Sequence, residues 1–167
     1  LGGLPREASF LVRVRISGHP PPPQRGRTSQ FWRADRSYTR LVMSTATVLL
    51  ISAQPADREH LAEALAAIRG QPYRLEVVSS LAEALSRIKH GRIDAILLAL
   101  TLPDSDGLTT FLRLQPKATH VPIVILVGPG EDEVGAEAIA RGALDSLQRD
   151  HLSATLVERV LRYATER

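Results

Sequence analysis

The sequence predicts a doubly wound α/β domain in which a parallel β-sheet carries helices on both faces. From residue 47 onward, short apolar runs of strand length alternate with longer stretches that have helical apolar spacing. The order of strand followed by helix repeats five times, and strands that alternate with helices of this length form parallel sheets. Right-handed crossovers between successive strands restrict the topology further.

The first strand and helix follow each other closely. Val48–Ile51 is continuously apolar, as expected for a parallel strand that is buried on both faces. Pro55 begins the first helix at a position where its missing N–H does no harm, and Gly70 ends that helix. The apolar positions of this helix are Leu61, Leu65 and Ile68. The second strand is predicted over residues 75–78.

Ser80 and Glu83 predict the start of the second helix. They stand three residues apart before an amphipathic run, which is the pattern of a capping box. In a capping box each side chain satisfies a free backbone N–H of the other residue. The apolar positions that follow are Leu81, Leu85 and Ile88, and Gly91 ends the helix.

The remaining elements follow the same alternation. Apolar runs predict a third and a fourth strand, and a weaker run predicts a fifth; these strands cover residues 93–100, 121–127 and 143–147. Helical spacing predicts three more helices, over residues 108–115, 132–141 and 153–165.

Residues 1–42 differ from the rest of the chain in composition. They hold eight arginines and two acidic residues, a net charge of +6, whereas the remainder has a net charge of −3. Four consecutive prolines at 20–23 favour extended, solvated backbone. Phe10–Ile16 alternates well enough for one short strand, but it has no evident partner.

We expect two regions: an Arg- and Pro-rich leader over residues 1–42 and a folded domain over residues 43–167. Met43 is the sole methionine, and we expect the native protein to start there, with the leader as upstream sequence in the same reading frame. A disordered basic arm and an organelle targeting peptide are the alternatives. A secretory signal over residues 41–53 is disfavoured because Ser44, Thr45 and Thr47 interrupt the apolar stretch.

Composition and motifs exclude several classes of function. The chain has no cysteine, which excludes disulfides, thiolate metal sites and cysteine nucleophiles. No apolar run approaches the ~18 residues of a membrane span. There is no Gly-x-Ser-x-Gly elbow and no Gly-rich loop after the first strand. The five histidines are scattered over different elements (His19, His60, His90, His120 and His151). We therefore expect neither an enzyme nor a small-molecule substrate.

Ligands of doubly wound sheets bind at the carboxyl ends of the strands, so the residues after Ile51, Leu98, Leu126 and Leu147 are the candidate site. The segments there carry a Leu-Pro-Asp-x-x-Gly loop at 102–107 and a Gly-Ala-x-Asp turn at 142–145. Together with 48–55 and 121–128, they resemble the receiver domain of two-component response regulators over residues 46–166. The resemblance implies a flavodoxin-like (βα)5 sandwich with a five-stranded parallel sheet in the order 2-1-3-4-5. It also implies a bacterial, cytoplasmic protein of phosphorelay signalling.

The resemblance also implies where the family's functional residues would lie. Receivers hold Mg²⁺ with an acidic pair after the first strand, and that pair falls on Ser52 and Ala53. The phosphoacceptor aspartate falls on Ala99 and the Ser/Thr after the fourth strand on Val127. An aromatic residue and a lysine near the fifth strand fall on Ser146 and Arg149. The chain therefore resembles a degenerate pseudo-receiver that lacks the phosphoacceptor.

These replacements remove the chemistry of phosphorylation. Mg²⁺ requires oxygen ligands with carboxylates supplying the charge, and only the Ser52 hydroxyl is left. Ala99 presents a methyl group, which is no nucleophile, and Val127 cannot bond a phosphoryl oxygen. We expect no Mg²⁺ and no phosphorylation at this position, although Arg149 remains a weak anion site.

Other aspartates near these strand ends have simpler interpretations. Asp104 and Asp106 follow the third strand, and phosphorylation at either is an alternative. As turn residues, they are expected to be solvated and to cap the helix that starts near Leu108. Asp57 is expected to be a favourable charge in the first turn of its helix.

A domain without this chemistry can still act by binding. The resemblance implies a docking face built from residues 132–141, the fifth strand and residues 153–165. The partner would be a signalling kinase, a sensor or an output module. The charged candidates on this face are Asp132, Glu133, Arg141, Arg149, Arg159 and Arg162.

The last helix has a second possible role. Its apolar stripe consists of Leu156, Val157, Val160, Leu161 and Ala164 and is expected to pack on the sheet. Residues 161–167 also resemble the helix by which receivers continue into a further module. Binding of nucleic acid or an anionic surface through the Arg-rich leader is the remaining alternative.

Overall fold

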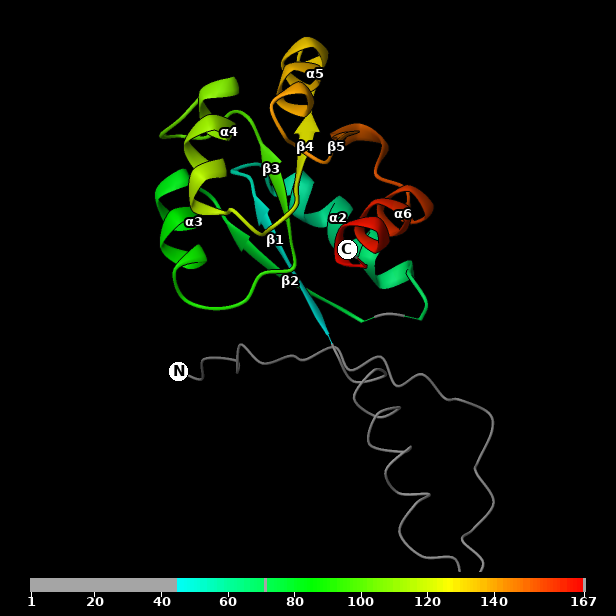
Figure 1. The fold of residues 1–167 in the computed structure, drawn as a ribbon. Helices are drawn as coiled ribbons and strands as arrows, with labels where there is room; N and C mark the ends of the chain where they lie inside the picture. Colours follow the sequence, from blue (N-terminus) through cyan, green and yellow to red (C-terminus); the bar gives the residue numbers. More distant parts are fainter. Residues whose placement is uncertain (1–44, 71, 167) are drawn as a thin grey trace, which may run out of the picture. The chain divides into compact units, whose positions relative to one another are not determined.

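The computed structural model describes residues 45–70 and 72–166, which form an α/β domain around one five-stranded sheet. The strands are all parallel, as the sequence predicted, and have the order β2-β1-β3-β4-β5 that the resemblance implied. The expected leader over residues 1–42 and the short strand at Phe10–Ile16 lie outside the described residues. Figure 1 shows helices on both sides of the sheet.

The strands are β1 (Ala46–Ile51), β2 (Tyr73–Val78), β3 (Ala95–Ala99), β4 (Ile123–Val127) and β5 (Asp145–Gln148). The α-helices are α2 (Pro55–Ala67), α3 (Leu81–Ile88), α4 (Leu108–Leu114), α5 (Asp132–Ala140) and α6 (Ala154–Thr165). Two 3₁₀ turns complete the described elements, η1 (Gln115–Lys117) and η2 (Arg149–His151).

Two apolar layers cover the two faces of the sheet. Side chains of a strand alternate between faces, so Leu49 and Ile51 enter one layer while Val48 and Leu50 enter the other. The first layer packs under α3, α4 and α5, and the second packs under α2 and α6. The apolar stripe predicted on the last helix belongs to the second layer, with Val157, Val160, Leu161 and Ala164 buried.

All five strands differ from their predicted bounds because apolar runs and hydrogen-bonded ladders end at different residues. β1 and β2 each begin two residues earlier than predicted. Ile93 and Leu100 are buried but lie outside β3. β4 begins two residues later than predicted, after Pro122. β5 is displaced toward Gln148 because the Ala143 N–H bonds to the carbonyl of Ala138 and completes the end of α5.

The helix ends follow local chemistry. The Ser80 hydroxyl accepts a bond from the Glu83 N–H at 3.2 Å, which confirms the predicted cap of α3. The Glu83 carboxylate accepts from the N–H of Ser79, one residue before the cap residue. The last helix begins at Ala154 because Ser153 is its cap residue. α4 ends at Leu114, and the 3₁₀ turn η1, which contains a proline, follows directly.

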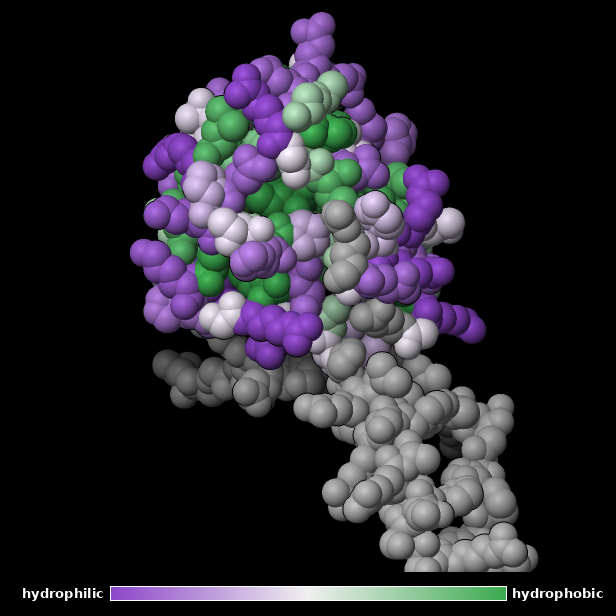
Figure 2. Space-filling model, viewed as in Figure 1, coloured by the Kyte–Doolittle hydropathy of each residue, from purple (hydrophilic) through white to green (hydrophobic). Residues whose placement is uncertain are grey.

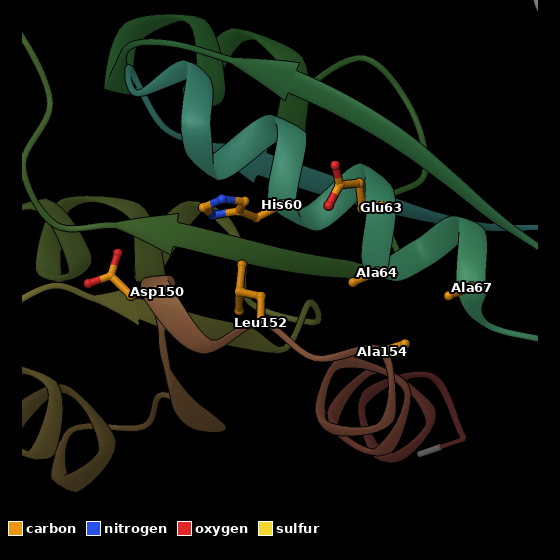
Figure 3. A pocket seen from close by; sticks show the side chains of 7 residues that line it. All are labelled: His60, Glu63, Ala64, Ala67, Asp150, Leu152 and Ala154. Carbon is orange, nitrogen blue, oxygen red and sulfur yellow. The ribbon is translucent and has the colours of Figure 1, made fainter.

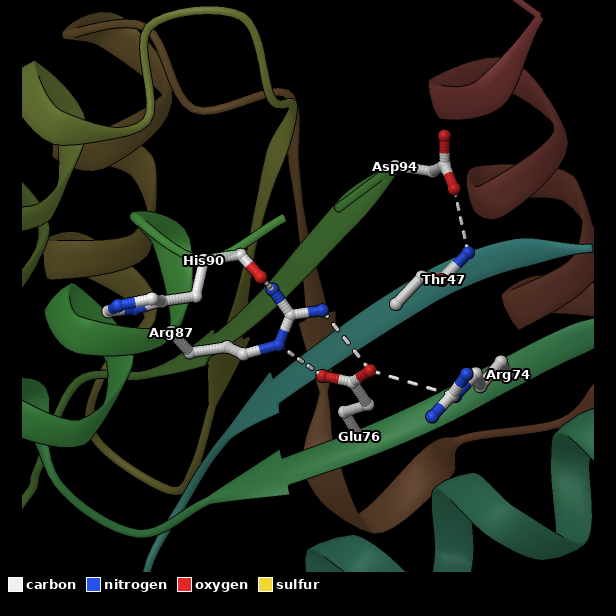
Figure 4. Close-up of polar contacts among 6 residues, drawn as sticks. All are labelled: Thr47, Arg74, Glu76, Arg87, His90 and Asp94. Carbon is white, nitrogen blue, oxygen red and sulfur yellow. Dashed lines mark hydrogen bonds and ion pairs between the residues drawn. The ribbon is translucent and has the colours of Figure 1, made fainter. Parts of the chain in front are cut away.

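An ion pair with two hydrogen bonds joins α3 to the edge strand β2. Arg87 donates from Nε and Nη2 to the two carboxylate oxygens of Glu76, at 2.5 and 3.1 Å (Figure 4). The Arg87 hydrogen bond lowers the pKa of Glu76. At the start of β1, the Asp94 carboxylate accepts from the Thr47 N–H at 2.7 Å.

On the face of the domain that Figure 2 shows, hydrophilic side chains predominate, and apolar side chains are visible between them. The large apolar residues with exposed surface lie on four different elements: Val77, Leu112, Ile139 and Tyr163. Within residues 45–70 and 72–166, no helix is both long enough and apolar enough for a membrane crossing.

Candidate functional site

The carboxyl edge of the sheet brings the predicted site positions together. Ile51 pairs with Leu98, and Ala99 pairs with Leu126. Ser52 directly follows β1, and Ala99 and Val127 end β3 and β4, so the three residues lie beside one another at one edge. Arg149 follows β5 at the same edge. The sequence-based placement of the site is thus consistent with the register of the strands.

The six positions differ in exposure. Ser52, Ala99, Val127 and Arg149 are buried, Ser146 is half-buried and Ala53 is exposed. Ala99 is 1% exposed, so its methyl group forms part of the packed edge of the sheet. The position to which the resemblance assigns the phosphoacceptor consequently presents a methyl group.

Asp57, in the first turn of α2, supplies a buried carboxylate at this edge. The Ser52 hydroxyl donates to Asp57 Oδ2 at 2.5 Å and accepts from the Gln54 N–H at 3.1 Å. The Asp57 side chain is 2% exposed and forms an ion pair with Arg149. These contacts make a buried polar cluster of Ser52, Asp57 and Arg149, which we call the edge cluster.

Arg149 is held in the edge cluster by charge more than by hydrogen bonds. Its side chain is 10% exposed, and its Nε lies 3.8 Å from Asp57 Oδ1, which is an ion-pair distance but too long for a hydrogen bond. Its buried Nε and Nη2 have no hydrogen-bond partner among the described residues. A buried guanidinium is tolerable only beside a counter-charge, and Asp57 is that counter-charge.

The burial of Asp57 corrects one sequence-based expectation. Asp57 does lie in the first turn of its helix, as expected, but it was interpreted as a simple favourable charge there. Its carboxylate also faces the strand ends and contacts Ser52, which follows β1, and Arg149 of η2. The signal in the sequence was its position two residues after Pro55, in the turn that follows a strand end.

The Val127 side chain packs against helix α5. A Cβ placed on Gly135 of α5 would lie 2.7 Å from Val127 Cγ1, so the helix approaches the strand only because residue 135 is glycine. The same Cβ would lie 3.7 Å from the Cβ of Ser146. Val127, at the position where the resemblance places a hydroxyl, is therefore packed closely against α5, whereas Ser146 would be at ordinary contact distance.

Asp104 and Asp106 also differ from their expected roles. Asp104 accepts from the N–H groups of Leu81 and Ala82, at 2.8 and 2.9 Å, and so caps α3. The expectation that it caps α4 was wrong, because Gly107 is the residue at that helix start. The two backbone bonds lower the pKa of Asp104. Asp106 is exposed and accepts from the Thr101 hydroxyl at 2.9 Å.

The donor set of the edge cluster does not match a magnesium site. The edge cluster offers one carboxylate, and that carboxylate already contacts a hydroxyl and a guanidinium. Mg²⁺ is bound through carboxylates in octahedral geometry, and an adjacent fixed cation opposes it. In the part of the chain that the structure describes, no three His, Asp or Glu side chains form a group that could hold a metal ion.

The candidate docking residues are split between surface and interior. Glu133 and Arg159 are exposed, on α5 and α6. Asp132 accepts from Gln148 Nε2 at 2.6 Å, and Arg141 and Arg162 pair with Glu137 and Glu158 within their own helical surfaces. Arg149 is the exception: its burial removes it from any docking face, which corrects the expectation.

The fold and the arrangement of its strand ends define a signalling domain of the receiver type. A profile of the response regulator receiver domain matches residues 48–161. The chain therefore belongs to the response regulator receiver domain family, and it contains the receiver domain of a two-component signalling protein.

The relatives that the chain resembles include a transcriptional regulator and a motility regulator. The chain is 28% identical to the transcriptional regulatory protein ZraR of Escherichia coli K12, over 60% of this chain and 24% of that protein. It is 32% identical to the swarming motility regulation protein RssB of Serratia marcescens, over 50% of this chain and 38% of that protein. The chain thus spans about a quarter to two fifths of the length of these relatives.

Solved structures agree on the fold. A signal receiver domain of an HD domain-containing protein from Pseudomonas fluorescens Pf-5 matches with a TM-score of 0.63 at 24% identity, covering 72% of this chain and 87% of that one. The receiver domain of a sensor histidine kinase from Pseudomonas aeruginosa PAO1 matches with a TM-score of 0.62 at 22% identity, covering 74% and 100%. That structure has a magnesium ion coordinated in its active-site cleft.

Proposed function

We propose that this chain is a phosphorylation-incompetent receiver domain that acts in two-component signalling through protein–protein contacts, without catalysis of its own. The observation that carries the proposal is the edge cluster. A methyl group stands at the acceptor position, and the adjacent buried arginine has an internal carboxylate as its counter-charge. The domain then keeps the receiver scaffold while lacking both a nucleophile and a Mg²⁺ site.

The proposed partner is a signalling kinase, a sensor or an output module, in a bacterial cytoplasm. The exposed surface of α5 and α6 supports a docking role because it presents both signs of charge, including Glu133 and Arg159. Contacts on such a surface set the specificity and the rate of association more than the affinity.

The test is a direct search for phosphorylation and for its analogue. The full chain is incubated with Mg²⁺ and acetyl phosphate and examined by intact mass spectrometry. In parallel, beryllofluoride with Mg²⁺ is added to the ¹⁵N-labelled chain and amide resonances are recorded. We expect no gain of a phosphoryl group and no metal-dependent shift of the resonances around residues 52, 99 and 127.

The Pseudomonas aeruginosa receiver, which coordinates Mg²⁺, is the assay control and should respond under the same conditions. A phosphoryl adduct on Asp104 or Asp106 would replace the proposal by atypical phosphorylation. Asp104 is poorly suited to this, because modification would remove two backbone bonds from the start of α3. An adduct elsewhere, or Mg²⁺-dependent shifts at the edge cluster, would equally contradict the proposal.

A further inference from the structure

A hollow lies between α2 and the segment that joins β5 to α6. It has a volume of about 280 Å³ and is lined by His60, Glu63, Ala64, Ala67, Asp150, Leu152 and Ala154. His60 and Asp150 lie toward one end, and Ala67 and Ala154 lie toward the other (Figure 3). This hollow is distinct from the edge cluster, because the neighbouring Arg149 is directed to Asp57 while Asp150 is exposed here.

The floor and rim of the hollow have different chemistry. The floor is made of Leu152 and three alanines, two from α2 and one from the start of α6. Their small side chains leave the space between these segments open. The rim carries the carboxylates of Glu63 and Asp150, together with the His60 ring. A ligand that fills this hollow must therefore cover an apolar floor and also satisfy negative charge.

The two rim carboxylates are unpaired within the described residues, which distinguishes them from many acidic groups of the domain. Glu76, Glu137 and Glu158 each pair with an arginine. No hydrogen bond or ion pair joins Glu63 or Asp150 to another described residue, and both are exposed. Their charge is thus available to a partner.

We propose that this hollow receives a basic side chain, lysine or arginine, from a protein partner; the inference rests on the proposed role in protein contacts. Three or four methylenes of such a side chain cover the floor, while its cationic head meets Asp150 at the His60 end of the hollow and Glu63 adds a second negative charge along the rim (Figure 3). The volume suits one side chain, since it falls below the ~300 Å³ at which small-molecule sites begin. An apolar side chain would remove water from the carboxylates without offering a hydrogen bond or a positive charge in its place. An anion would be repelled by the same carboxylates.

The experiment uses the ¹⁵N-labelled full chain and an acetylated alanine pentapeptide with one central arginine. We expect saturable shifts of the amides at 60–67 and 149–154, which weaken as salt is raised because exposed charges are screened. The same peptide with norleucine in place of arginine should give no saturable shift. The double variant E63Q/D150N should weaken binding of the arginine peptide by about fivefold, as expected for the loss of one exposed ion pair and a nearby negative charge.

Glu59→Gln is the matched control, because Glu59 is an exposed carboxylate of α2 that does not line the hollow. It should leave the apparent affinity within about twofold of the unaltered chain. The inference is overturned if no saturable shift occurs, if shifts map elsewhere, if norleucine binds equally, or if E63Q/D150N has no larger effect than the control. None of these outcomes depends on phosphorylation, so failure here is separable from failure of the acetyl phosphate and beryllofluoride test.

Discussion

Asp57 and Arg149 are buried residues of opposite charge, and each is favourable only in the presence of the other. Their side chains are 2% and 10% exposed, so solvent screens the charges weakly. Removing one partner leaves an uncompensated charge in a region of low polarity, which costs more than the net contribution of the pair. The edge cluster is therefore a unit, and substitutions within it should not be additive.

We predict that Asp57→Ala lowers the free energy of unfolding by about 2–4 kcal/mol, because it leaves the Arg149 guanidinium unpaired. Arg149→Met should also destabilise the domain, but the double variant should be less destabilised than the sum of the two single variants, by at least about 1 kcal/mol. Urea unfolding of the four proteins measures this coupling. Glu59→Ala, an exposed change on the same helix, should stay within about 0.5 kcal/mol. Strict additivity would show that Asp57 and Arg149 do not interact.

The sequence allows the positions of the edge to be predicted but not their partners. Ala99 and Val127 could be placed because strand ends of a parallel sheet share one edge, whatever their side chains. The role of Asp57 could not, since a carboxylate in a first helical turn is equally well explained by the helix dipole. Its burial depends on how α2 lies against η2, and these elements are far apart in the chain.

The elements of the domain are joined by contacts that cross long stretches of sequence. Asp104, in the loop after β3, caps α3 rather than the helix that directly follows it. Local reasoning assigned this aspartate to α4, because a turn residue usually caps its own helix. A cap provided from another segment cannot be read from local spacing.

We predict that Asp104→Asn lowers the melting temperature at neutral pH. We also predict that the melting temperature of this variant changes less as the pH is lowered. Backbone hydrogen bonds hold the pKa of Asp104 below its usual value. Its stabilising contribution is therefore complete above the ordinary aspartate pKa and is lost as the pH falls through the lowered folded value. Melting curves of both proteins between neutral and strongly acidic pH should converge at the acidic end. Asp106→Asn is the control, because its carboxylate bonds a hydroxyl and not a helix start.

Gly135 sets the distance between α5 and the sheet. Inside a helix, replacing glycine by alanine ordinarily stabilises the helix by up to about 1 kcal/mol. Here the added methyl would meet Val127 Cγ1 at 2.7 Å, and overpacking of this kind costs about 1–3 kcal/mol. We therefore predict a net loss of stability for Gly135→Ala, of about 1 kcal/mol. In the presence of Val127→Ala the same substitution should become neutral or stabilising in urea unfolding, and a loss that persists would refute the packing argument.

At the scale of the whole molecule, the succession of five strand–helix units along the chain was predictable from the sequence. Strands and helices space their apolar residues differently, and this spacing reflects which side chains are buried. Strands covered on both faces are continuously apolar, and helices covered on one face are amphipathic. The exact bounds were less predictable, since Ile93 and Leu100 are buried without belonging to the ladder of β3. Burial and backbone pairing are separate properties, and the sequence pattern reports mainly the first.

The two apolar layers share one sheet, and this predicts that they unfold together. Leu97 and Leu98 are adjacent in β3 and almost fully buried, yet Leu97 packs under α2 and α6 while Leu98 packs under α3, α4 and α5. Leu97→Ala and Leu98→Ala should each cost about 2–5 kcal/mol, because each creates a cavity beside the same strand. Since every central strand contributes to both layers, neither layer can persist after the other loses its strands.

The measurement follows urea unfolding by far-ultraviolet circular dichroism and by amide resonances of α4 and α6. For each variant, we expect the circular dichroism and both sets of resonances to give one coincident midpoint, lowered from that of the unaltered chain. A Leu98→Ala variant whose α4 resonances are lost at a lower urea concentration than its α6 resonances would show that the layers unfold separately. In that case α5 and α6, which form the proposed docking surface, would belong to two layers of different stability. A bound partner would then stabilise the two layers unequally.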